Sequence, residues 1–216
     1  MSPPADRREL PKGQPVKTTR WPRTDRRAQR VAAVLARRQP DLSVVLENVH
    51  DPHNVSAVLR SCDAVGVLAV HLVYTAEEPP AGAFARTTSA SAAKWVETHR
   101  HPSIDACYAQ LRRQGMAVLA TALGEESQDL YDLDLARPTA LVFGNEMRGV
   151  SAEAATAADA LVAIPMAGMV ESLNISVACA VALFEAFRQR RAAGAYDRPK
   201  LGDEALASFQ DDWLCR

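Results

Sequence analysis

Three distant segments of this chain each contain an apolar run that ends abruptly in a turn of small and polar residues. They comprise residues 48–66, 143–149 and 164–178, and the first continues into an amphipathic helical pattern. Glycines in such turns let the backbone approach a ligand closely. Turns at the carboxyl ends of strands in an α/β sheet commonly meet around one pocket. The three segments therefore predict an α/β sheet with a single site at the ends of its strands.

The rest of the chain alternates between expected strands and expected helices. Strands are expected at residues 43–47, 68–74, 95–98, 116–120, 139–143 and 161–164, and helices at 24–38, 54–65, 103–114, 151–158, about 173–191 and 204–213. The apolar stripe of helix 54–65 consists of Val55, Val58, Leu59, Cys62 and Val65. The stripe expected to face the core in the long helix near the end consists of Leu173, Val177, Ala180, Val181, Phe184 and Phe187. This alternation predicts a mostly parallel sheet flanked by helices.

The net charge of −1 conceals a strong asymmetry between the first forty residues and the rest. Residues 1–40 hold 11 basic and 3 acidic side chains, a balance of +8, whereas the remaining residues hold 14 basic and 23 acidic ones, a balance of −9. A segregated basic arm indicates a polyanionic partner. On charge alone, a solvated and partly helical tail explains the arm equally well. The excess of arginine over lysine favours phosphate recognition, because guanidinium groups bind phosphate bidentately.

Several classes of protein are disfavoured by what the sequence lacks. No apolar run approaches the ~18 residues that a membrane span needs, and the N-terminus is polar, so neither a membrane partner nor a secretory signal is expected. The four cysteines show no CxxC spacing and indicate reduced thiols in a cytoplasmic protein. His50 and His53 lack further ligands at metal spacing, and His99 and His101 form only an isolated HxH, so no metal is expected. The loop at 75–92 is long for a compact domain, which predicts a mobile functional segment.

Five polar residues in or near the three turns are candidates for chemistry. Arg60 is predicted to face away from the apolar stripe of its helix, beyond the turn that contains Asn54. Glu146 lies between two glycines directly after an expected strand, while Ser172 and Asn174 open the last long helix. Each of them alone has a simpler explanation, as a helix cap or as a solvated surface residue. Their occurrence in three turns of the same form is what favours a shared site.

The three turns resemble a known family. The pattern Asn48-x3-Pro52-x-Asn54-x5-Arg60-x5-Gly66, then Gly144-x-Glu146-x2-Gly149, then residues 164–178 with Ser172 and Asn174, is similar to the three motifs of SPOUT-superfamily RNA ribose 2′-O-methyltransferases. The similarity is closest to the TrmH branch, which methylates guanosine 18 of tRNA, and it extends over about residues 20–200. All three motifs occur in order, and together they are far more specific than any one of them.

The resemblance implies a fold, a cofactor and a partner. It implies a parallel α/β sheet with a C-terminal trefoil knot at about residues 116–190, S-adenosyl-L-methionine held within the knot, and a homodimer with each active site at the subunit interface. The implied cofactor contacts are Thr121, Gly144, Ile164 and Leu173. The implied catalytic residues are Arg60, Asn54, Glu146, Ser172 and Asn174. Arg60 would be central, as a general base, as a contact to the adjacent phosphate, or as a group that polarises the ribose hydroxyl.

The resemblance also gives the basic arm a role in binding tRNA. The implied RNA-binding residues are Arg20, Arg23, Arg26, Arg27, Arg30, Arg188, Arg190 and Arg191. The expected organisation is a basic arm and helix at 1–40, a methyltransferase domain at 41–193 and a C-terminal tail with a helix at 194–216. Alternative interpretations are a ribosomal RNA 2′-O-methyltransferase and a non-catalytic RNA-binding relative. The first typically carries an N-terminal domain of its own, whereas only about forty residues precede the first strand here.

Overall fold

The core of the protein is a parallel sheet of seven strands in the order β3-β2-β1-β6-β4-β7-β5. A computed structural model describes residues 25–75 and 92–216. The strands are β1 (Leu42–Glu47), β2 (Ala69–Val73), β3 (Glu97–His101), β4 (Ala117–Thr121), β5 (Gln128–Asp129), β6 (Thr139–Phe143) and β7 (Ala160–Ala163). The expected parallel α/β sheet is therefore confirmed. The central strands are the most apolar, and every residue of β1 and β6 is buried, as expected for parallel strands covered on both faces.

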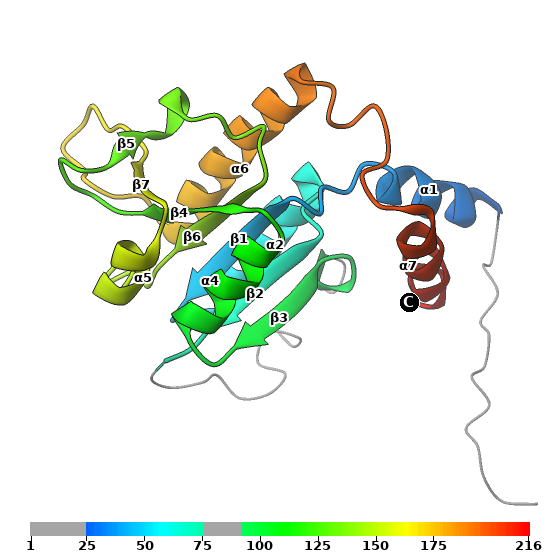
Figure 1. The fold of residues 1–216 in the computed structure, drawn as a ribbon, viewed down its shortest axis with the longest axis horizontal. Coiled ribbons are helices and arrows are strands. Elements are labelled where there is room, and N and C mark those ends of the chain that lie inside the picture. The colour runs from blue at the N-terminus through cyan, green and yellow to red at the C-terminus, as the bar shows by residue number, and fades with distance from the viewer. Residues whose placement is uncertain (1–24, 76–91) are drawn as a thin grey trace, which may run out of the picture.

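Helices α2 (Pro52–Val65) and α6 (Ile175–Ala192) cover one face of the sheet, and α4 (Ile104–Arg113) and α5 (Ala152–Ala157) cover the other. Helices α1 (Asp25–Leu35) and α7 (Asp203–Cys215) lie together to one side of the sheet (Figure 1). Two short 3-10 turns are η1 (Ala92–Lys94) and η2 (Leu130–Asp132). Side chains just before α4 and α6 define their starts: Ser103 Oγ accepts from the Ala106 amide at 3.1 Å, and Asn174 Oδ1 accepts from the Ser176 amide at 2.9 Å. Such caps satisfy amides that the first turn of a helix leaves unpaired.

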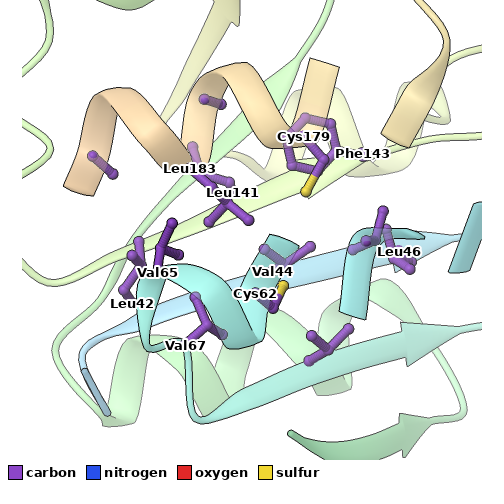
Figure 2. Close-up of a cluster of buried hydrophobic side chains, with 14 of the residues drawn as sticks. Leu42, Val44, Leu46, Cys62, Val65, Val67, Leu141, Phe143, Cys179 and Leu183 are labelled. Atoms are coloured by element: carbon purple, nitrogen blue, oxygen red, sulfur yellow. The ribbon is translucent and has the colours of Figure 1, made fainter. Parts of the chain in front are cut away.

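Two hydrophobic clusters fix these layers. The first packs α2 and α6 against one face of the sheet, as Figure 2 shows for Cys62 of α2, Cys179 of α6 and Val44 of β1. The second packs α4 and α5 against the other face and includes Val45, the neighbour of Val44 along β1. Because successive strand residues point to opposite faces, one apolar strand supplies both clusters.

The two ends of the described chain pack against each other. Val31 and Leu35 of α1 form a cluster with the buried Trp213 of α7. Arg38, which the charge count assigns to the basic arm, is fully buried; it pairs with Asp63 and lies 4.9 Å from the centre of the Trp213 ring. Arg38 therefore belongs to the core of the protein rather than to a phosphate-binding arm.

The structure corrects several sequence-based boundaries. The strand expected at 95–98 is β3 at Glu97–His101, and β5 and η2 were not predicted. The loop expected at 75–92 lies almost entirely outside the described residues. No helix in residues 25–75 or 92–216 is long and apolar enough to cross a membrane. Of the four thiols, which are all free, only that of Cys215 is exposed.

The expected core stripe of the long helix is partly wrong. In α6 the buried residues are Ile175, Cys179, Ala182, Leu183, Glu185, Ala186 and Arg190. Val181 and Phe187 of the expected stripe are partly buried and pack against the first cluster, whereas Val177 and Phe184 are 47% and 51% exposed. Apolar residues occupy opposite sides of this helix. The side that packs on the sheet also carries the charged Glu185 and Arg190, so the sequence pattern did not favour it.

Candidate active site

The turn after β1 is held to the turn after β6. Asn48, directly after β1, has a positive φ of 53°. Its side-chain oxygen accepts a hydrogen bond from the amide of Thr75, which follows β2, at 2.9 Å. The backbone carbonyl of Asn48 accepts a hydrogen bond from Asn145 Nδ2 at 3.0 Å. The first and second sequence motifs are therefore joined directly at the carboxyl edge of the sheet.

The second motif forms a tight loop that only glycine allows at its start. A Cβ on Gly144 would lie 2.0 Å from the carbonyl carbon and oxygen of Gly149, far inside van der Waals contact. The Asn145 carbonyl accepts from the Gly149 amide at 2.8 Å, and Gly149 has a positive φ of 67°. The loop closes on itself and leaves Glu146 exposed.

Asn54, in the first motif, is bonded to both of the other motifs. Asn54 Nδ2 at the start of α2 donates to Glu146 Oε1 at 2.6 Å, and Asn174 Nδ2 at the start of α6 donates to Asn54 Oδ1 at 3.2 Å. We call these three side chains the Glu146–Asn54–Asn174 network. A charge-assisted bond such as that of Glu146 is shorter and stronger than a neutral one. The structure thus brings three of the five predicted catalytic residues into one chain of contacts.

The other two predicted catalytic residues stand on the same segments as members of this network. Arg60 is exposed and follows Asn54 by six residues along α2, which corresponds to about 9 Å along the helix axis. Ser172 is exposed and precedes Asn174 by two residues. Both are accessible to a substrate from outside.

The predicted cofactor-binding residues gather at three neighbouring strands. Thr121 ends β4 and pairs with Val162 of β7, while Gly144 and Ile164 directly follow β6 and β7. These three strands are adjacent in the sheet, so the three positions share its carboxyl edge. The hydroxyl of Thr121 donates to the Val142 carbonyl at 2.9 Å. Leu173, the fourth position, adjoins Asn174 of the network.

Large apolar side chains remain uncovered in the loops around this edge. The exposed ones are Leu123, Met147, Met169, Val170 and Leu173. Met169 is 100% exposed and Met147 is 93% exposed. An apolar patch of this kind usually marks a binding surface. The edge therefore has the character of a site that a ligand or a second chain covers.

The predicted RNA-binding arginines fall into three groups. Arg26, Arg27 and Arg30 are exposed on α1, whereas Arg20 and Arg23 lie outside the described residues. Arg188 and Arg191 are exposed on α6, although Arg188 forms an ion pair with Glu185 at 2.7 Å.

Arg190 was predicted as part of that set, and the structure corrects this prediction. Its side chain is fully buried, and it donates to Asp41 Oδ1 at 2.7 Å and to the Leu135 carbonyl at 3.0 Å. A guanidinium enclosed in this way has no surface to offer to a phosphate. Arg190 therefore ties the end of α6 to the start of β1 and does not bind RNA.

Sequence reasoning missed two residues that shape the site. Asn145 bridges two turns, and the buried Glu47 at the end of β1 accepts from the Ser151 amide at 2.8 Å. The signal for Glu47 was a charged residue at the end of a mostly apolar strand. The first was visible only as a polar residue next to Glu146.

Comparison with known proteins defines the class of this site. Residues 41–184, which contain all three motifs, match the SpoU rRNA Methylase family. Because this match covers well over half of the chain, the protein belongs to that family.

The names of individual relatives are more specific than the name of the family. The chain is 50% identical over 192 residues to a tRNA (guanosine(18)-2′-O)-methyltransferase of Thermus thermophilus, covering 89% of this chain and 97% of the relative. A crystal structure of an A. aeolicus TrmH/SpoU tRNA modifying enzyme superposes with a TM-score of 0.77 at 36% identity, covering 88% of this chain and 96% of that one. The AdoMet-bound rRNA methyltransferase from Sinorhizobium meliloti gives a TM-score of 0.59 at 31% identity, over 73% of this chain and 59% of that one.

Proposed function

We propose that this protein methylates the 2′-hydroxyl of guanosine 18 in tRNA with S-adenosyl-L-methionine as the methyl donor. The observation that carries the proposal is the Glu146–Asn54–Asn174 network, which joins the three motifs at the carboxyl edge of the sheet. Family membership supports the reaction, and the tRNA enzyme of Thermus thermophilus, matched over nearly its whole length, supports the substrate. Residues 41–193 would form the methyltransferase domain, in agreement with the family match over 41–184.

The residues at the strand ends are suited to this cofactor. Gly144 and its neighbours offer backbone groups rather than charged side chains, and apolar Leu173 lies next to them. Such a surface fits a ligand with an aromatic base and a thioether-like chain better than it fits a triphosphate. When bound, S-adenosylmethionine supplies a methyl group already activated on a sulfonium, so the protein itself needs no covalent intermediate.

The protein's contribution is then to align the ribose. Holding two reactants in reactive geometry removes much of the entropic barrier to their reaction. Asn174 holds Asn54, and Asn54 in turn fixes the Glu146 carboxylate, which would brace the site next to the incoming ribose, while Ser172 offers a further hydroxyl. An arginine side chain stays protonated in proteins, so Arg60 would act as a hydrogen-bond donor to the ribose oxygen or to its adjacent phosphate, while the proton of the hydroxyl passes to solvent water.

The exposed arginines of α1 would bind the tRNA backbone. Arg26, Arg27 and Arg30 lie within two turns of one helix and present a concentrated positive charge. Contacts of this kind to phosphates position a nucleic acid without reading its sequence. Arg20, Arg23, Arg188 and Arg191 are further candidates for such phosphate contacts.

A homodimer completes the proposal. Leu173, Val177 and Phe184 are large apolar residues exposed on one side of α6 or just before it. The same side of the helix contains a groove of about 480 Å³ lined by Phe184, Phe187, Arg188, Arg191 and Ala192. Burying an apolar stripe against its own copy is the usual basis of a two-fold dimer. The C-terminal knot implied by the family belongs to the same proposal.

The decisive experiment follows a labelled methyl group. Purified protein is incubated with methyl-labelled S-adenosylmethionine and an unmodified tRNA transcript, and the labelled nucleotide is mapped. We expect one label per tRNA on the ribose of guanosine 18 and none on a transcript that carries 2′-deoxyguanosine there. Label that appears only on ribosomal RNA would replace tRNA by rRNA as the substrate. A lack of label on either RNA, with intact cofactor binding, would contradict the enzymatic function.

A further inference from the structure

Three side chains with metal-binding atoms meet at the edge of the sheet formed by β3, on the face covered by α4. The parallel pairing of β2 with β3 sets His71 opposite His99 and Val73 opposite His101. His71 Nδ1 and His101 Nε2 lie 2.8 Å apart. Cys107 comes from α4, and its Sγ and the two imidazole nitrogens all lie within 4.8 Å of one another. The three residues belong to three different elements, so only the fold brings them together.

The cluster is largely shielded from solvent. His71 and Cys107 are buried, and His101 is half-buried. A metal binds a neutral imidazole and a thiolate. Loading the site therefore requires Cys107 to give up its proton.

The spacing is close to that of a tetrahedral zinc site. Zinc bonds of about 2.0–2.1 Å to histidine and about 2.3 Å to cysteine place neighbouring donor atoms roughly 3.3–3.5 Å apart. The two nitrogens are slightly closer than this, and no pair is more than 4.8 Å apart. The three donor atoms are therefore already near enough to one another to share one ion. Two imidazoles and a thiolate favour zinc over magnesium or calcium, which prefer oxygen ligands.

We infer that His71, His101 and Cys107 form a binding site for Zn²⁺, with a water molecule in the fourth position. On binding, the Cys107 thiol releases its proton to solvent and the direct bond between the two imidazoles is replaced by two bonds to the metal. The ion would connect β3, at the edge of the sheet, to β2 and α4. The site lies on the opposite face of the sheet from α2 and α6, and its proposed role is structural. No sequence motif indicates it, because His71 and Cys107 stand apart from the HxH pair.

Cobalt tests the site without relying on methyl transfer. The full-length chain, purified without a histidine tag, is titrated with Co²⁺ while its visible and near-ultraviolet absorption is recorded. We expect one ion per chain, the ligand-field bands of a tetrahedral site, and a thiolate-to-cobalt charge-transfer band. Cobalt bound without that charge-transfer band, or no stoichiometric binding, would overturn the inference.

Zinc affinity in variants identifies the ligands. Competition with a chromophoric chelator should show binding weakened at least tenfold by Cys107→Ser and by His101→Gln, because even residues that only orient metal ligands are worth about 10–100-fold. His50→Gln, which changes an exposed histidine outside the cluster, should leave the affinity unchanged. A loss below tenfold in either ligand variant would refute the site, and a small loss in Cys107→Ser beside a large one in His101→Gln would indicate a surface chelate by His99 and His101 instead. Should Cys107→Ser not fold, His101→Gln and the cobalt spectrum of the unmodified chain still decide the question.

Discussion

The backbone at Gly144 leaves no room for a side chain. We expect Gly144→Ala to destabilise the protein by about 1–3 kcal/mol, because its methyl group would collide with the backbone of Gly149. The matched control is Gly168→Ala, where an added Cβ meets no atom within 4 Å. That control should stay within about 0.5 kcal/mol of the parent. Urea unfolding midpoints measure both, and equal losses in the two variants would contradict the expectation.

Arg60 can be tested by a substitution that keeps its charge. Lysine retains the positive charge but loses the planar fork that binds two oxygens at once. We expect Arg60→Lys to lower kcat at least about 100-fold, the scale of losing one well-placed donor in a transition state. Because Arg60 is exposed, the stability of the protein should change little. Steady-state kinetics separate the roles: a raised KM with unchanged kcat would assign Arg60 to substrate binding alone.

Single residues show where sequence reasoning succeeded and where it failed. Asn54, Glu146 and Asn174 were predicted together because each stands in a turn after an apolar run, and the structure joins them. Their order within the network was not predictable, since it depends on rotamers and on the distance between two helix starts. Arg190 was misassigned because its sequence neighbours are exposed arginines, and only its position on the inner side of α6 buries it.

Helix α6 has two apolar sides, and the outer one predicts an association. We expect Phe184→Asp to raise the dimer dissociation constant at least about tenfold. The phenyl ring is 51% exposed in the single chain, and burying half of such a side chain is worth roughly 1 kcal/mol in each subunit. Sedimentation velocity over a range of concentrations measures the constant. Thr156→Asp, at an exposed position on α5, is the control. A monomeric parent chain would refute the dimer itself.

Helix α1 makes a separate prediction about salt. Replacing Arg26, Arg27 and Arg30 by glutamine should weaken tRNA binding. It should also reduce the slope of log affinity against log salt concentration by up to about 3, because each lost phosphate contact removes about 1 from that slope. Arg113→Gln, at the exposed end of α4, should leave the slope unchanged. Filter binding at several salt concentrations gives both slopes. An unchanged slope in the triple variant would remove α1 from the RNA-binding surface.

Most secondary-structure elements were predictable, and the exceptions share a physical cause. β6 was predicted to the residue because it is a short apolar run between turn residues. β3 was misplaced by two to three residues because its sequence is polar, and its strand form comes from pairing with β2 along one edge. β5 has only two residues, which is too short for its sequence to show the alternating pattern of a strand. Elements defined by tertiary contacts alone are the ones that a sequence pattern misses.

The topology brings two basic residues from the end of the chain to one carboxylate near its start. Asp41, just before β1, accepts from Arg190 at the end of α6 at 2.7 Å and from Lys200 beyond that helix at 2.6 Å. Burial alone would raise the pKa of Asp41, but the hydrogen bonds and charges of Lys200 and Arg190 outweigh it and hold that pKa below the ordinary 3.8. The buried guanidinium of Arg190 in turn depends on this carboxylate for its charge balance.

These contacts predict a loss of stability in acid. A carboxyl group with a lowered pKa in the folded state stabilises the fold above its unfolded pKa, and this contribution disappears as the pH falls through the folded pKa. At pH 7 we expect Asp41→Asn to cost up to about 3–5 kcal/mol, because it leaves a buried charge without its partner. Below about pH 4 the difference between parent and variant should shrink, as the parent's carboxylate is itself protonated.

Asp134→Asn is the control: it breaks an exposed pair with Arg137 and should cost at most about 1 kcal/mol. Urea unfolding at several pH values measures all three proteins, and a difference between parent and Asp41→Asn that does not change with pH would show that Asp41 acts through packing rather than through its charge.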